Sequence, residues 1–209
     1  MIHGYHLILP AYGFWLPNDP RGSWSAFVGK WELVRFGKTT RSLCRRELCE
    51  LTDAELTERE AAWRSLKYSA VQFTGLQARG VGQGFAQACR KGRYAIWACA
   101  ILPEHTHLVI ARHRYSIEQT AILLKGAATR QLVDEQRHPL AAFAEPGQSP
   151  PRMWAEHQWA VYLDSEQAIE SAIGYVDDNP RQEGKPPQTW SFMTPFNGLP
   201  KSGWVTYGS

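Results

Sequence analysis

The sequence lacks the features of a membrane or secreted protein. The apolar stretch Tyr94–Leu102 is only as long as a strand, and no apolar run is long enough to cross a bilayer. The chain starts without the basic stretch and long apolar segment of a signal peptide. Its cysteines form no Cys-x-x-Cys pair, which favours reduced thiols in the cytosol over a disulfide framework; they are Cys44, Cys49, Cys89 and Cys99. We therefore expect a cytoplasmic protein with no membrane contact.

Internal repeats and low-complexity tracts are also missing. With 209 residues and 44% hydrophobic residues, the chain can bury one sizeable core. We expect a single domain over residues 1–180, with a Trp- and Gly-rich excursion at 13–50 and an irregular tail at 181–209.

The chain has little net charge, only +3, but its charged residues are unevenly distributed. The segment Arg21–Arg46 holds seven basic residues against the single acid Glu32, which makes the segment +6 and the rest of the chain −3. Such a segment either contacts a polyanion or is a solvated loop. Its aromatic residues Trp24, Trp31 and Phe36 either stack on unpaired bases or tether the excursion to the core. The basic residues are Arg21, Lys30, Arg35, Lys38, Arg41, Arg45 and Arg46.

The hydrophobic pattern predicts the element order β-α-β-β-α-β, followed by one more helix. Strands are expected at 5–12, 94–102, 105–110 and within 153–163. Helices are expected at 74–90, at 117–137 and from Asp164 to Pro180, and a capping box at Thr52 predicts a further helix to about Lys67. This order is that of an α+β, ferredoxin-like antiparallel sheet with helices on one face, here extended by the long N-terminal excursion and by a C-terminal helix and tail.

Two histidines stand two residues apart at the start of the third predicted strand. Side chains at positions i and i+2 of a strand share one face, so His105 and His107 project together while Thr106 faces the other way. Two imidazoles held in this way can bind one divalent cation.

A tyrosine and an asparagine occur four residues apart near the end of the last predicted helix. Tyr175 and Asn179 therefore lie on one side of that helix. The asparagine amide can supply a third metal ligand, and the phenol is a potential nucleophile beside a polarised phosphodiester.

Three segments in this order resemble the HUH-type tyrosine single-strand transposases, in the branch related to REP-associated tyrosine transposases. Leu102-Pro-Glu-His-Thr-His-Leu-Val-Ile110 resembles their HUH motif, and Tyr175-Val-Asp-Asp-Asn-Pro180 resembles their Tyr-x-x-x-Asn-Pro helix. Tyr12-Gly-Phe-Trp-Leu-Pro-Asn-Asp-Pro-Arg-Gly22 resembles the N-terminal signature of that branch. The resemblance covers residues 4–195. Two positions depart from the family pattern: Thr106 replaces a large apolar residue, and Glu104 replaces the usual asparagine and either binds the ion or occupies the turn.

The resemblance implies a metal-dependent single-stranded DNA endonuclease that cuts at or near DNA hairpins and rejoins strands. It implies Mg²⁺ or Mn²⁺ held by His105, His107 and Asn179, and a 5′-phosphotyrosine intermediate on Tyr175. The partner is then single-stranded or hairpin DNA, contacted by the basic excursion, or by Lys125 and Arg130 of the third helix if the excursion does not bind.

Two other functions remain open at this point. The first is a hairpin-DNA-binding protein of the same fold that does not cut, and the second is a metal-dependent nuclease without a covalent step. Only the transposase leaves a protein–DNA adduct on a denaturing gel. The sequence is compatible with a monomer and with a homodimer.

Overall fold

The computed structural model describes residues 1–14 and 52–199. The chain divides into two compact units, Met1–Ala11 with Gln72–Ser209, and Tyr12–Val71. Most of the predicted excursion at 13–50 lies outside the described residues, and the expected domain limits at 180 and 181 stay a prediction. No helix in the described parts of the chain is both long and apolar enough to span a membrane.

The first unit has the predicted α+β order. Its elements are β1 (Gly4–Pro10), α3 (Gly75–Gly92), β2 (Ile96–Ile101), β3 (His105–Ala111), α4 (Ile117–Asp134), β4 (Trp159–Leu163) and α5 (Glu166–Gln182). The four strands form one sheet in the order β2-β3-β1-β4, and all neighbouring strands are antiparallel. This is the order of a ferredoxin-like sheet, and β3 lies in its interior as predicted.

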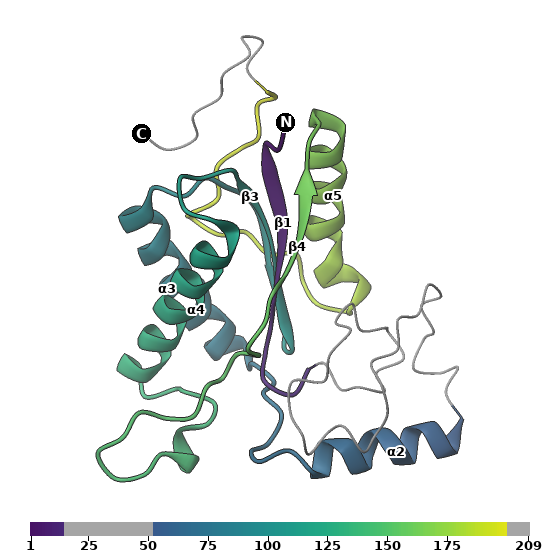
Figure 1. Ribbon diagram of the computed structural model, residues 1–209, viewed down its shortest axis with the longest axis vertical. Helices are drawn as coiled ribbons and strands as arrows, with labels where there is room; N and C mark the ends of the chain where they lie inside the picture. Colours follow the sequence, from purple (N-terminus) through teal and green to yellow (C-terminus); the bar gives the residue numbers. More distant parts are fainter. Residues whose placement is uncertain (15–51, 200–209) are drawn as a thin grey trace. The chain divides into compact units, whose positions relative to one another are not determined.

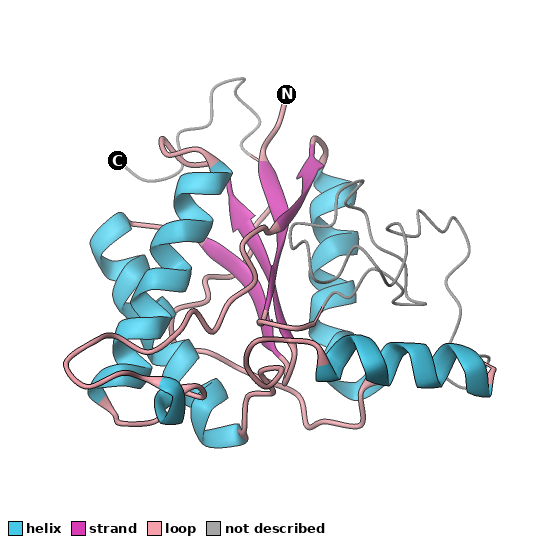
Figure 2. Ribbon diagram, turned by 60° about the horizontal axis from the view of Figure 1, so that its bottom comes forward, coloured by secondary structure: helices cyan, strands magenta, loops and turns pink. Residues whose placement is uncertain are grey.

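Helices cover both faces of this sheet (Figures 1 and 2). The helices α3 and α4 lie together on one face, and α5 lies on the other. The expected helix pair on one face is thus confirmed, with the C-terminal helix opposite. Because both faces are covered, every residue of β3 is buried, and the alternation of its side chains decides which layer each one meets.

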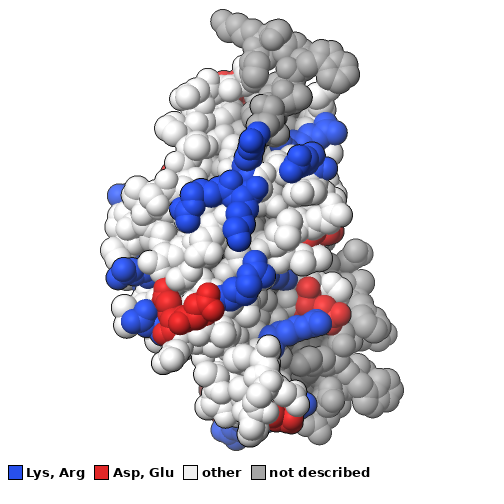
Figure 3. Space-filling model, turned by 90° about the vertical axis from the view of Figure 1, so that its left-hand side faces the viewer, with Lys and Arg blue, Asp and Glu red and all other residues white. Residues whose placement is uncertain are grey.

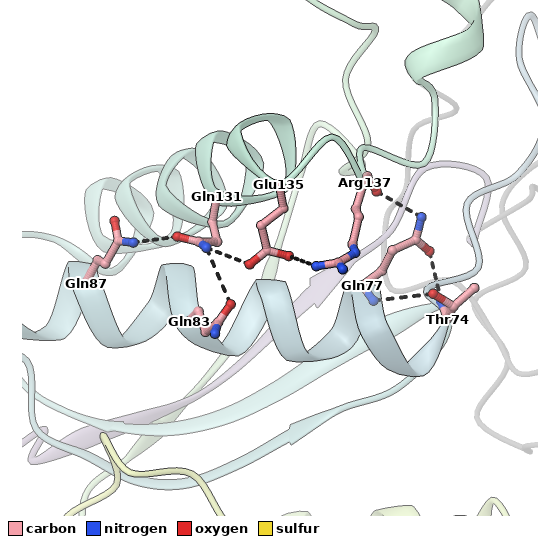
Figure 4. A network of polar contacts seen from close by, with 7 residues as sticks. All are labelled: Thr74, Gln77, Gln83, Gln87, Gln131, Glu135 and Arg137. Atoms are coloured by element: carbon pink, nitrogen blue, oxygen red, sulfur yellow. Dashed lines mark hydrogen bonds and ion pairs between the residues drawn. The ribbon is translucent and has the colours of Figure 1, made fainter.

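Small residues allow α3 and α4 to approach each other closely. A Cβ atom added at Gly84 would lie 2.5 Å from the Cα atom of Ala128. Polar side chains border this contact (Figure 4): Gln131 donates to Glu135 at 2.7 Å, and Arg137 donates to the same carboxylate at 2.8 Å. These hydrogen bonds from Gln131 and Arg137 hold the pKa of Glu135 below its usual value. Gly84, which would weaken α3 as an isolated helix, is therefore explained by tertiary packing.

We expect Gly84→Ala to lower the free energy of unfolding by about 2 kcal/mol, because the helices must separate to admit the methyl group. Equilibrium urea unfolding measures this loss. Gly174→Ala is the matched control, since a Cβ atom there has nothing within 4 Å and alanine favours a helix by about 1 kcal/mol. Equal stability of the Gly84 variant and the wild type would show that the helices do not pack in this way.

The strand β2 is an edge strand by hydrogen bonding, although its sequence is apolar on both faces. All its residues are nevertheless buried. The irregular segment after α5 covers its free edge: Gln188 accepts from the Ile101 N–H and donates to the Ile101 carbonyl, both at 2.8 Å, and the Thr194 N–H donates to the Ile96 carbonyl. The edge is thereby closed to pairing with another chain.

The helix α5 starts and ends slightly later than predicted. Ser165, not Asp164, is the N-cap, since its hydroxyl accepts from the Ala168 N–H at 3.2 Å. The helix also continues through Pro180 to Gln182. The helix ends beyond the proline, where the N–H of Lys185 donates to the Pro180 carbonyl at 2.7 Å and Gly184, at φ 65°, closes the turn.

The second unit contains α2 (Asp53–Arg64), which begins at the predicted capping box. The Thr52 hydroxyl accepts from the Glu55 N–H, and the Glu55 carboxylate accepts from the Thr52 N–H. The unit is closed by the Val71 N–H, which donates to the Tyr12 carbonyl at 2.8 Å.

Candidate functional site

The two histidines of β3 lie side by side, as the alternation of a strand predicts. Their ring centroids are 4.7 Å apart, and both residues are buried. They share their side of β3 with Val109, which packs in the cluster beneath α5. The pair is therefore enclosed between the sheet and α5.

Tyr175 of α5 reaches this histidine pair. Its ring centroid lies 5.6 Å from that of His107, in an edge-to-face arrangement. The helix positions it through Ile169, Ala172 and Val176, which are buried against the sheet. Asn179, one helical turn further on, is also buried, at 5% exposure. The fold thus brings together a phenol and two imidazoles that are about 70 residues apart in the sequence, and it buries an amide one turn from the phenol.

A third histidine, His6 of β1, belongs to the same cluster and was missed by the sequence reasoning. Its Nε2 lies 2.9 Å from Nδ1 of His107, and its ring centroid is 5.6 Å from that of Tyr175. The β1–β3 register places His6 opposite Val109, so that it reaches His107 diagonally. Burial lowers the pKa of His6 to about 4, which keeps this imidazole neutral near pH 7. The available signal was its position in β1, on the side opposite to Leu7 and Leu9.

Two glutamates flank the histidines in different ways. A carboxylate oxygen of Glu183, just beyond α5, lies 4.0 Å from Nε2 of His105. Glu104 occupies the turn before β3, where its carbonyl accepts from the Ala11 N–H and its carboxylate accepts from the Gln72 amide at 3.1 Å. These contacts favour the turn role for Glu104 over metal binding.

The donors in this cluster fit a divalent cation only if an amide takes part. Within residues 1–14 and 52–199, no three His, Cys, Asp or Glu side chains are grouped closely enough to hold a metal. His105 and His107 offer two nitrogens, and Asn179, a buried residue one helical turn from Tyr175, offers an amide oxygen. Imidazole and amide donors suit divalent ions such as Mn²⁺, and they leave coordination positions for phosphate or water.

Thiols do not compete with the phenol as nucleophiles in this part of the chain. Cys89 and Cys99 are buried and unpaired with each other. Burial raises the pKa of Cys89 to about 12 and the pKa of Cys99 well above its usual value, so both stay protonated.

The predicted DNA-binding residues differ in whether their side chains are available to a phosphate. The ammonium group of Lys125 donates to the Ala155 carbonyl at 2.9 Å and to the His157 carbonyl at 3.3 Å, and burial lowers its pKa to about 8. This lysine therefore holds the loop before β4, which weighs against a phosphate contact, whereas Arg130 is exposed on α4. The other predicted residues lie outside the described part of the chain: Arg21, Lys30, Arg35, Lys38, Arg41, Arg45 and Arg46.

The fold and the cluster define a ferredoxin-like domain with a histidine pair facing a helical tyrosine. No protein-family model and no curated protein matches the chain. It is similar to a solved REP-associated tyrosine transposase bound to a REP hairpin, with 15% identity, a TM-score of 0.43, and coverage of 66% of this chain and 83% of that one. It is also similar to a Deinococcus radiodurans R1 protein proposed to be a transposase, with 11% identity, a TM-score of 0.39, and coverage of 90% of this chain and 94% of that one. At these identities and TM-scores, the likeness assigns no activity, substrate or partner to this chain.

Proposed function

We propose that this protein is a metal-dependent transposase that cleaves single-stranded DNA at or near hairpins through a 5′-phosphotyrosine on Tyr175 and then rejoins strands. The observation that carries the proposal is the contact of the Tyr175 ring with His107, which itself packs against His105 in a buried pair. A tyrosine that only packs at the edge of a core does not need histidines as neighbours. Tyr175, His105 and His107 also come from motifs that resemble those of tyrosine transposases.

The covalent step follows from the side chains of the cluster. The phenol oxygen of Tyr175 forms a bond to the phosphorus of the scissile phosphodiester, and the bond from phosphorus to the 3′ oxygen breaks. The phenol proton goes to solvent, and the departing 3′ oxygen takes a proton to become a 3′-hydroxyl. In rejoining, that hydroxyl or another one attacks the phosphotyrosine and releases the phenol. His105, His107 and Asn179 would hold a divalent cation, which would supply Lewis-acid polarisation of the phosphate.

The test is a cleavage assay on single-stranded oligonucleotides with and without a hairpin, in Mn²⁺, in Mg²⁺ and in EDTA. The proposal expects cleavage near the hairpin in the presence of either metal, with a free 3′-hydroxyl on one product. Binding of hairpins with no cleavage under any of these conditions would favour the alternative of a non-cleaving hairpin-binding protein.

His6 acts in this proposal as a positioning residue for His107. If His107 uses Nε2 for the cation, its Nδ1 carries the hydrogen and donates to the neutral His6 at the observed 2.9 Å. Such a hydrogen bond fixes both the tautomer and the ring orientation of a metal-binding histidine.

We expect His6→Phe to weaken Mn²⁺ binding by about 10- to 100-fold, because the ring volume is kept but the acceptor is lost. His6→Gln keeps an acceptor and should lose less. Electron paramagnetic resonance of free Mn²⁺ measures the affinity, and ¹⁵N NMR of the apoprotein reports the His107 tautomer. An unchanged tautomer and affinity in His6→Phe would remove His6 from this role.

A further inference from the structure

Five cationic side chains gather at the end of the sheet opposite to the histidines. Two belong to the last turn of α3, one follows that helix, and two follow β3; all five are exposed. We call this group the end patch, and it consists of Arg90, Lys91, Arg93, Arg112 and Arg114. Figure 3 shows Lys and Arg gathered in the upper half of the face that carries α3 and α4.

The two segments that carry the end patch are fixed to each other. Nε2 of His113 lies 2.9 Å from the Gly92 carbonyl, and the His113 ring packs edge-on against Tyr94 with centroids 4.7 Å apart. The Ala111 N–H donates to the Ala95 carbonyl at 2.9 Å. The cations are therefore presented from a rigid support and not from a loop that would have to be ordered on binding.

Acids are absent from the two segments that carry the end patch, and the nearest acid along the chain is Glu118. No Asp or Glu occurs within residues 88–96 or 108–117. Ion pairs in the described parts of the chain occur elsewhere and hold other arginines, namely Arg64, Arg137 and Arg181. The end patch thus leaves its positive charge to an external anion.

One residue of the end patch has an unusual backbone conformation. Arg93 follows α3 in the left-handed conformation, with φ 57°, where glycine would be unstrained. Gln136, beyond α4, has the same conformation at φ 56°, so this angle by itself marks no function. It does provide a position where an arginine can be replaced by glycine with relief of strain.

We propose that the end patch binds the phosphate backbone of the paired stem of a DNA hairpin. The choice of a duplex follows from the side chains, because single strands use exposed aromatic faces for their bases. Tyr115 is 37% exposed, but the guanidinium of Arg114 lies over its ring and the His113 ring packs against it. Long cations without free aromatic faces suit phosphates. From His107 to Arg112 the strand spans roughly 17 Å at ~3.3 Å per residue, which equals about five base pairs of duplex. The identity of the polyanion rests on the proposed function.

The test compares hairpin binding by two triple variants over a series of salt concentrations. Arg90→Ala with Arg112→Ala and Arg114→Ala removes three charges from the end patch. Arg64→Ala with Arg79→Ala and Arg152→Ala removes three exposed charges elsewhere and serves as the control. Fluorescence anisotropy with a labelled, uncleavable hairpin gives the affinity. The end-patch variant should lose about 2 to 3 units of the slope of log K against log salt, at about 0.9 per phosphate contact. The control variant should lose less than 1.

A single variant excludes misfolding as the cause. Arg93→Gly removes one cation while relieving the left-handed strain, so it should keep or raise the melting temperature and still weaken hairpin binding several-fold. Unchanged salt slopes in the end-patch variant would overturn the inference. The inference would also be overturned if the end-patch variant lost binding to vesicles of anionic phospholipid but kept its hairpin binding. A wild type that binds through the end patch but never cleaves would refute the proposed function and leave this inference standing.

Discussion

Tyr175→Phe is expected to abolish the covalent protein–DNA adduct, a loss of about 10⁴-fold or more, as when other catalytic nucleophiles are removed. The phenol oxygen is the proposed attacking atom. The ring that remains keeps its packing against His6 and His107, so hairpin affinity should stay within a few fold. A denaturing gel with an oligonucleotide labelled at its 3′ end measures the adduct, because a 5′-phosphotyrosine carries the 3′ fragment.

Tyr162→Phe is the matched control for this experiment. Tyr162 is an exposed tyrosine of β4 that packs against Tyr5. It should form as much adduct as the wild type. If the adduct survives in Tyr175→Phe and disappears in Tyr162→Phe, the nucleophile is Tyr162 of β4.

His107→Ala is expected to eliminate cleavage and to weaken Mn²⁺ binding by about 100-fold or more. The change removes one of two imidazole ligands and leaves His6 without its hydrogen-bond partner at 2.9 Å. His105→Ala should behave similarly, and EDTA should reproduce the loss in the wild type. Asn179→Ala should be milder, because water can fill a single vacated position.

Isothermal titration with Mn²⁺ and the cleavage assay together check this prediction. His157→Ala changes an exposed histidine outside the cluster and should affect neither measurement. Full cleavage in excess EDTA, or wild-type Mn²⁺ affinity in both His105→Ala and His107→Ala, would show that the histidine pair does not hold a catalytic metal.

The sequence was sufficient where a local pattern determines the structure. Alternation in a strand places His105 and His107 on one side, and the capping boxes before α2, α3 and α4 mark where these helices begin. The order of elements was sufficient to place β3 inside the sheet. The grouping of the histidines with Tyr175 was expected only from their chemistry and from the resemblance of their motifs, and the position of α5 on the face that carries the histidines was not predicted.

Other features depend on contacts that no local pattern contains. His6 meets His107 through a register between strands 101 residues apart. Burial of β2 depends on Gln188, which satisfies an edge strand from a segment without regular structure. Lys125 was predicted to bind phosphate, but its ammonium group donates to carbonyls of the loop before β4. The end patch forms only when the end of α3 meets the end of β3.

The most direct test of the proposed function is to map the adduct on the wild-type protein. The protein is incubated with Mn²⁺ and a hairpin oligonucleotide, digested with trypsin and nuclease, and analysed by tandem mass spectrometry. The tryptic peptide that follows Arg152 and ends at Arg181 contains both Tyr162 and Tyr175, so fragmentation must separate the two. We predict a nucleotide phosphate on Tyr175. Cleaved DNA with no modified tyrosine, or with the modification on Tyr162, would contradict it.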